Sequence, residues 1–175
     1  MRFQLLLIFF ILLHYNGFSQ SHLTNNTKQS LDSIWNDLVF KHGGCLTGGQ
    51  HVKNGKFGGG RCVMSGKGRY GENWNEFFSH KKSDLTLFLV EKFNDTTLTK
   101  IHTCPCNSAS NAEVAVYALQ KIHLTNWYDL IYFSKYKIRE DKGCENNPQK
   151  WLNDLITKPK ERANLKHAWL RLANK

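Results

Sequence analysis

The pattern of apolar and polar residues first becomes regular near Lys28. Apolar residues recur there at three- and four-residue spacing, at Leu31, Ile34, Trp35, Leu38 and Val39. This spacing places them on one side of a helix, and the other side carries Asp32, Asn36 and Asp37. Gly43 can adopt the left-handed conformation that ends a helix. The pattern therefore predicts a helix from about Lys28 to His42.

Two shorter apolar segments follow. A short helix is predicted by three aromatic residues, Trp74, Phe77 and Phe78. The apolar run 85–93 comes after Ser83 and Asp84, which can cap a helix N-terminus. The run also alternates as a strand does, at Leu85, Leu87 and Leu89. It is therefore predicted as a helix, with a strand as the alternative.

Further helices are predicted in the second half of the chain. Ser110 and Glu113 have the spacing of a capping box, in which each side chain binds a backbone N–H of the first turn. The apolar positions of that helix are Ala115, Ala118, Leu119 and Ile122. Segment 127–133 is also predicted to be helical. Two last helices are predicted to open at Asn147-Pro148 and at Pro159, with Trp151, Leu152, Leu155 and Ile156 on the first and Leu165, Ala168, Trp169 and Leu172 on the second.

Segment 43–71 has an unusual composition, because it contains eleven of the 13 glycines. Within it, Asn54-Gly55 is a strong signal for a tight hairpin turn. Short strands are expected on either side of the turn, at His51-Val52 and Lys56-Phe57. The segment is therefore predicted as a glycine-rich β-hairpin insertion with loose loops.

These elements predict a mainly α fold, a compact bundle of six or seven short helices with a glycine-rich β-hairpin insertion. An α+β fold is the alternative if 85–93 is a strand. The five tryptophans are expected to anchor the core, because each can bury about 200 Å². The expected organisation is a signal peptide at 1–19 and one mainly helical domain at 20–175.

The first residues have the features of an export signal. Arg2 is followed by an apolar run, Phe3 to Leu13, that is too short to span a bilayer. Small residues at Gly17 and Ser19 predict cleavage after Ser19. We therefore expect an exported protein that is periplasmic, on the cell surface or extracellular, with no transmembrane segment in the mature chain.

The five cysteines all lie beyond the predicted signal, where export allows disulfides to persist. Cys45 and Cys62 are predicted to form a bridge across a turn-rich loop, which would stabilise the fold by about 3 kcal/mol. A candidate thiol site contains Cys104, Cys106 and Cys144, and one of the first two could pair with the third. Because the number of cysteines is odd, at least one must stay reduced, pair between chains or bind another group.

Metal and redox chemistry form the alternative function. Cys104-Pro-Cys106 could bind a soft metal or form an easily reduced disulfide. The cluster His42, Cys45, His51 and Cys62 offers nitrogen and sulfur ligands, although its spacing is not that of a structural zinc site. The sequence predicts no cofactor, and it lacks the Walker phosphate-binding loop. An enzyme is therefore the less favoured interpretation.

Charge favours a different function. The chain has 24 basic and 14 acidic residues and a net charge of +10. Between Asp37 and Glu72 there is no acid, and the basic residues there include Lys53, Lys56, Arg61, Lys67 and Arg69. Those five are the predicted anion-binding residues, since their fields add and glycine amides can face an anion. The basic residues of the last helix scatter around its solvent side.

Two functions thus remain open from the sequence. The first is an exported non-catalytic binding module whose basic glycine-rich loop engages an acidic polysaccharide, a lipid headgroup or an acidic protein. The second is an exported thiol-redox or soft-metal-binding protein. Export argues against nucleic acid as the partner.

Overall fold

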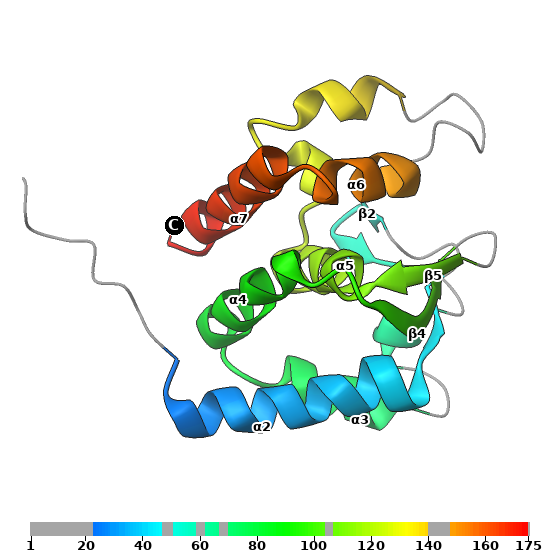
Figure 1. The fold of residues 1–175 in the computed structure, drawn as a ribbon, viewed down its shortest axis with the longest axis vertical. Coiled ribbons are helices and arrows are strands. Elements are labelled where there is room, and N and C mark those ends of the chain that lie inside the picture. Colours follow the sequence, from blue (N-terminus) through cyan, green and yellow to red (C-terminus); the bar gives the residue numbers. More distant parts are fainter. Residues whose placement is uncertain are drawn as a thin grey trace, which may run out of the picture.

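The structure, a computed structural model, describes residues 23–46, 51–58, 62–66, 70–103, 107–139 and 148–174. These residues form a mostly helical fold with six α-helices and small mixed sheets (Figure 1). The predicted signal at 1–19 lies outside the described residues.

The bounds of the elements are as follows. The α-helices are α2 (Asn25–Asn36), α3 (Gly71–Phe78), α4 (Lys82–Glu91), α5 (Asn111–His123), α6 (Pro148–Ile156) and α7 (Pro159–Ala173). The strands are β1 (Gly44–Cys45), β2 (Val52–Lys53), β3 (Lys56–Phe57), β4 (Leu98–Thr103) and β5 (Asn107–Ser110). A π-helical turn, η1 (Asp37–His42), follows α2, and 3-10 turns are η2 (Val63–Ser65), η3 (Lys92–Asn94), η4 (Trp127–Asp129) and η5 (Ser134–Arg139).

Helix α5 lies at the centre of the molecule (Figure 1). Every residue from Asn111 to Gln120 is buried. The predicted capping box is confirmed: the Ser110 side chain accepts from the Glu113 amide, and the Glu113 carboxylate accepts from the Ser110 amide at 2.8 Å. The first turn of this buried helix is therefore satisfied within the protein.

Helix α2 and η1 confirm the predicted first helix and its end. The helix begins earlier than predicted, at Asn25, because the Thr24 side chain accepts from the Thr27 amide. Gly43 ends η1 with a φ of 71°. A Cβ atom at this position would lie 2.3 Å from the carbonyl oxygen of Lys100, so no other residue fits there without a shift of β4.

Helices α3 and α4 confirm the helical predictions for 74–78 and most of 85–93, and the strand alternative for 85–93 is wrong. The predicted cap at Ser83 or Asp84 is also wrong, because α4 begins at Lys82 with Lys81 as a cap that makes no side-chain hydrogen bond. The Ser83 hydroxyl donates instead to the Asp84 carboxylate. The helix therefore begins before both predicted caps, and the buried Thr86 hydroxyl donates to the carbonyl of its first residue, Lys82.

The remaining helical predictions have mixed outcomes. Pro159 begins α7, as predicted, and α6 begins at Pro148, while the predicted cap Asn147 lies outside the described residues. Only 127–129 of segment 127–133 is helical, as a 3-10 turn. The buried Gln120 side chain accepts from the Trp127 amide at 2.8 Å, and this bond fixes the tight turn in place of a regular helix.

A three-stranded sheet in the order β1-β4-β5 is the main element that the sequence did not predict. Strand β1 pairs in parallel with β4, and β4 pairs antiparallel with β5. Strand β4 buries every second residue, Thr99, Ile101 and Thr103. Two of these three are threonines, so the alternation is hidden from an apolar pattern. The Thr99 hydroxyl is satisfied by donating to the carbonyl of Ala109 at 2.8 Å.

The five tryptophans are all buried, which confirms their prediction as core anchors. Trp35 packs against Phe77 with ring centroids 5.2 Å apart and against Trp74 at 6.1 Å. The Trp35 indole donates to the side chain of Asn111 at 2.7 Å, so α2 is tied to the start of α5. No helix among the described residues is long and apolar enough to cross a membrane.

His123 closes the other end of α5 as a buried neutral side chain. The Thr86 hydroxyl donates to the carbonyl of Lys82, so its oxygen accepts the Nε2 proton of His123 at 2.9 Å. The ring also packs against Trp169, with centroids 5.4 Å apart. Burial lowers the pKa of His123 to about 4, and the positive charge of Lys82 acts in the same direction.

This histidine should make stability depend on pH. Its folded pKa lies below its unfolded value, so the stabilisation is complete above pH 6.5 and is lost as pH falls from 6.5 towards 4. We expect the free energy of unfolding to fall by about 2 to 3 kcal/mol from this group between pH 7 and pH 4.5. Urea unfolding at both pH values measures the change.

A matched pair of variants assigns this pH dependence. His123→Gln should flatten it, because glutamine can bond to Thr86 and does not titrate. The exposed His167 of α7 serves as the control, and His167→Gln should keep the wild-type slope. Equal wild-type stability at pH 7 and pH 4.5 would contradict the buried neutral assignment.

Candidate functional site

The hairpin predicted at Asn54-Gly55 is present as β2 and β3. Val52 pairs with Phe57, and Lys53 pairs with Lys56, across a two-residue turn. Asn54 has a φ of 51° and Gly55 a φ of 70°. Positive φ at both positions is the geometry of a type I′ turn, which matches the twist of paired strands.

Two of the predicted anion-binding residues lie side by side on this hairpin. Lys53 and Lys56 are direct cross-strand neighbours, and both are exposed. Val52 and Phe57, the pair next to them, are partly buried. Two like charges directly opposite each other repel, so this pair favours a bound anion over an empty surface.

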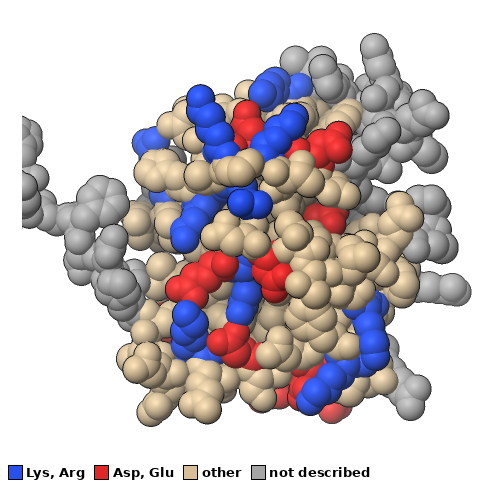
Figure 2. Space-filling model, viewed as in Figure 1, with Lys and Arg blue, Asp and Glu red and all other residues tan. Residues whose placement is uncertain are grey.

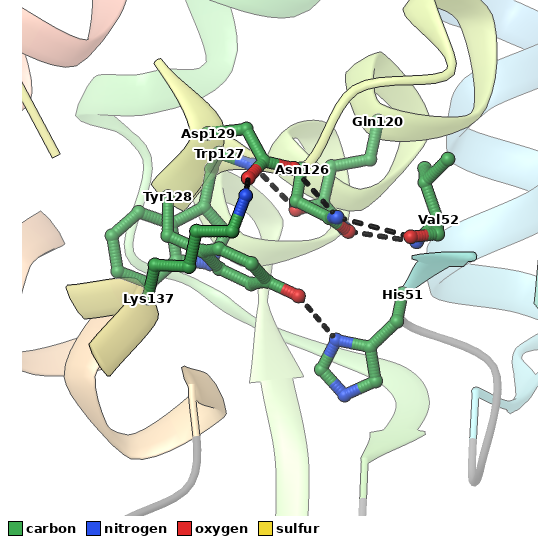
Figure 3. Close-up of polar contacts among 8 residues, drawn as sticks. All are labelled: His51, Val52, Gln120, Asn126, Trp127, Tyr128, Asp129 and Lys137. Carbon is green, nitrogen blue, oxygen red and sulfur yellow. Dashed lines mark hydrogen bonds and ion pairs between the residues drawn. The ribbon is translucent and has the colours of Figure 1, made fainter. Parts of the chain in front are cut away.

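The hairpin is attached to the helical core by Asn126, a buried residue just beyond α5. Its side-chain oxygen accepts from the Val52 amide at 2.7 Å, and its nitrogen donates to the Val52 carbonyl at 3.1 Å (Figure 3). The amide group therefore pairs with both backbone groups of Val52, as a neighbouring strand would. The hairpin is held at its base.

Asp129 and Lys137 support Asn126 from the other side. The nitrogen of Asn126 also donates to the Asp129 carboxylate at 2.9 Å, and Lys137 donates to the same carboxylate at 2.8 Å (Figure 3). Partial burial of Asp129 works to raise its pKa, but the bonds from Lys137 and Asn126 outweigh it and the pKa lies below its ordinary value. The orientation of Asn126 is thus fixed by an ionised carboxylate.

A second contact ties the start of the hairpin to the same turn. The Nδ1 atom of His51 lies 3.1 Å from the hydroxyl of Tyr128, which belongs to η4 (Figure 3). Tyr128 is buried, and its neighbour Trp127 is fixed by Gln120. The hairpin is therefore fastened at two consecutive residues, His51 and Val52.

The other predicted anion-binding residues, Arg61, Lys67 and Arg69, lie outside the described residues. The structure therefore brings Lys53 and Lys56 together and leaves the other three as predictions. Basic and acidic side chains are interspersed on the face of the molecule drawn in Figure 2.

The predicted bridge between Cys45 and Cys62 is not formed in the structure, and it remains a prediction. Cys45 is exposed on β1, and Cys62 is buried. Burial raises the pKa of the Cys62 thiol, and the charge of Cys45 acts in the same direction against hydrogen bonds from the amides of Met64 and Ser65. The candidate thiol residues Cys104, Cys106 and Cys144 lie outside the described residues.

The histidines of the predicted His42, Cys45, His51 and Cys62 cluster have separate aromatic neighbours. His42 stacks on Tyr70 with ring centroids 4.3 Å apart, whereas His51 contacts Tyr128. In the part of the chain that the structure describes, no group of three or more His, Cys, Asp or Glu side chains is placed to hold a metal ion. The thiol or soft-metal function therefore rests on sequence alone.

Sequence reasoning missed the residues that position the hairpin. Asn126 follows one predicted helix, and Asp129 lies within segment 127–133, which was predicted to be helical; Asn and Asp are common near helix ends and turns for many local reasons. The pairing of Asn126 with Val52 spans 74 residues of chain. A lone hairpin-turn signal does not reveal its docking partner, so no sequence pattern could have found them.

No family model matches the chain, and neither a curated protein nor a solved structure matches it.

Asn126→Ala should destabilise the fold by about 1 to 3 kcal/mol, because it leaves polar groups of Val52 without their partner. Urea unfolding at neutral pH measures the loss. The control is Asn153→Ala on the exposed face of α6, which should change stability by less than about 0.5 kcal/mol. Equal stability of the Asn126 variant and the wild type would show that the hairpin is not docked through this side chain.

Proposed function

We propose that this protein is an exported, non-catalytic binding module that engages an acidic partner through its glycine-rich basic segment. The binding residues are Lys53 and Lys56 on the hairpin, together with Arg61, Lys67 and Arg69 from the same segment. Acidic polysaccharides, lipid headgroups and acidic proteins all carry the carboxylate, sulfate or phosphate groups that such a surface attracts.

One observation supports this proposal most directly. Lys53 and Lys56 are exposed cross-strand neighbours on a hairpin that Asn126 fixes to the core. Fixed charges bind an anion at lower entropic cost than charges on a loose loop. The four ion pairs among the described residues use Lys28, Lys41, Lys92 and Lys137. The two hairpin lysines are thus not neutralised by a described carboxylate.

The last helix is a weaker candidate, although it is also basic. Arg162 donates to the carbonyl of Ile156 at 3.1 Å, and Arg171 donates to the hydroxyl of Tyr132 at 3.3 Å. Two of its cations are therefore already used within the protein. This difference supports the hairpin segment as the binding face.

A pair of double variants tests the proposal. Lys53→Gln/Lys56→Gln removes the hairpin charges, and Lys158→Gln/Lys160→Gln removes two exposed charges at the start of α7. We expect the hairpin variant to elute from immobilised heparin at clearly lower salt than the α7 variant, because counterion release depends on the contacts made rather than on net charge. Circular dichroism of both variants should match the wild type.

Equal elution of the two variants would show that only net charge matters, and it would reject the hairpin as a binding face. A larger set extends the comparison to the rest of the segment. One variant replaces with Gln the five predicted anion-binding residues, Lys53, Lys56, Arg61, Lys67 and Arg69. The other variant replaces with Gln five basic residues of the C-terminal segment, Lys160, Arg162, Lys166, Arg171 and Lys175. Binding to anionic vesicles and to polyglutamate then ranks the three partner classes.

A further inference from the structure

A separate cavity of about 300 Å³ opens where α3 ends, α4 begins and α5 ends. Its lining divides into an apolar part, Phe78, Leu85 and Ile122, and a basic part, His80, Lys82 and Lys121. The volume is at the small end of the range for ligand pockets in proteins. An apolar wall with a few convergent polar groups is the usual composition of such pockets.

Lys121 is the partly buried cation of the cavity lining. Its ammonium donates to the carbonyl of Met64 and lies 4.6 Å from the centroid of the Phe78 ring. The residue is partly buried, and no described carboxylate pairs with it. Burial lowers the pKa of Lys121, against the charge of Cys62. Its described partners, a carbonyl oxygen and an aromatic ring, carry no net charge, so a bound anion would add a charged partner.

His80 also lines the cavity, and one of its two ring nitrogens has no described partner. Its Nδ1 atom lies 3.2 Å from the carbonyl oxygen of Glu76 and 3.1 Å from that of Phe77. Carbonyl oxygens only accept, so Nδ1 carries the proton and Nε2 is left for another group. The Nε2 atom then accepts, so it can bind a donor on a ligand, such as the O–H of a protonated phosphate or carboxyl group.

Lys82 adds a third basic group and is the first residue of α4. The partial positive charge of the α4 N-terminus therefore adds to the charge of its side chain. The field of Lys82 reaches into the core, since it helps to lower the pKa of His123. Glu76 and Asp84, the acids nearest in sequence, do not line the cavity. The positive field is therefore not cancelled by the lining.

We propose that this cavity binds a small organic anion, a phosphate or carboxylate group attached to an apolar body. Lys121, Lys82 and His80 contact the anionic group, and Phe78, Leu85 and Ile122 contact the body. The site is distinct from the hairpin, because it shares none of the five basic residues assigned to the glycine-rich basic segment.

The two-part lining sets the specificity that the site should show. A ligand that has only the anionic group gains the charge interactions but leaves the apolar wall of the cavity exposed to water. A ligand that has only the apolar body leaves Lys121 without an anionic partner. A ligand with both parts should therefore bind more tightly than either fragment. Phenyl phosphate is a suitable probe, with inorganic phosphate and phenol as its fragments.

Amide chemical shifts of the isotope-labelled mature protein, titrated with each probe, test the proposal. We expect phenyl phosphate to shift the signals of His80, Leu85 and Ile122 and to bind at least about tenfold more tightly than inorganic phosphate. Lys121→Met keeps the aliphatic length of the side chain and removes its charge. It should weaken phenyl phosphate binding about tenfold, as expected for the loss of one charged hydrogen bond.

Two further variants keep the test decisive. Lys82→Gln alters an exposed side chain, so it should fold normally and also weaken binding if Lys121→Met proves unstable. Lys53→Gln/Lys56→Gln should bind phenyl phosphate like the wild type, which separates this site from the hairpin. The proposal is overturned if phenyl phosphate binds no better than inorganic phosphate, if the shifted signals lie elsewhere, or if both cavity variants bind like the wild type.

Discussion

The burial of α5 is the constraint on which the rest of this structure depends. Each of its first ten residues is buried, so its polar side chains depend on partners inside the protein, and the hydroxyl of Tyr117 is the one among them that finds no hydrogen-bond partner in the described residues. Those partners come from different elements: Asn111 accepts from Trp35 of α2 and donates to Asp95 after η3, and Gln120 accepts from Trp127 of η4. His123 donates to Thr86 of α4. The hydrogen bonds made by the buried polar side chains of α5 therefore fix the positions of several neighbouring elements.

Both proposed binding sites follow from this arrangement at the end of α5. Lys121 belongs to its last turn, and Asn126 lies three residues after it ends. The first places a cation against the apolar wall of a cavity, and the second fixes the base of a basic hairpin. At the cavity, Lys121 is itself the cation. At the hairpin, Asn126 fixes the strand next to Lys53 and Lys56. The chain has a net charge of +10, and some of its basic residues are thus fixed at two places, the cavity and the hairpin, while others are spread over the surface.

The sequence predicted best where a residue acts on its own neighbourhood. The capping box at Ser110 and Glu113, the turn at Asn54-Gly55 and the helix end at Gly43 are local, and all are confirmed. The β4–β5 pair was missed because Thr99 and Thr103 bury their hydroxyls through bonds to other strand residues. The bonds between Asn126 and Val52 and the cavity at Lys121 both bring together segments that are far apart in the chain. The spacing of residues along the sequence does not predict such contacts. Lys53 and Lys56 were predicted as candidates from charge alone, but their fixed position came from the fold.

The central claim is that the basic hairpin is a fixed part of the fold and not a loose solvated loop. Hydrogen exchange at the Val52 amide tests it most directly, because that amide donates to the buried side chain of Asn126. We expect exchange more than about a hundredfold slower than in an unstructured peptide, which corresponds to a local opening free energy of about 3 kcal/mol. Exchange of Val52 at the rate of an unstructured peptide, while the amides of α5 stay protected, would contradict it.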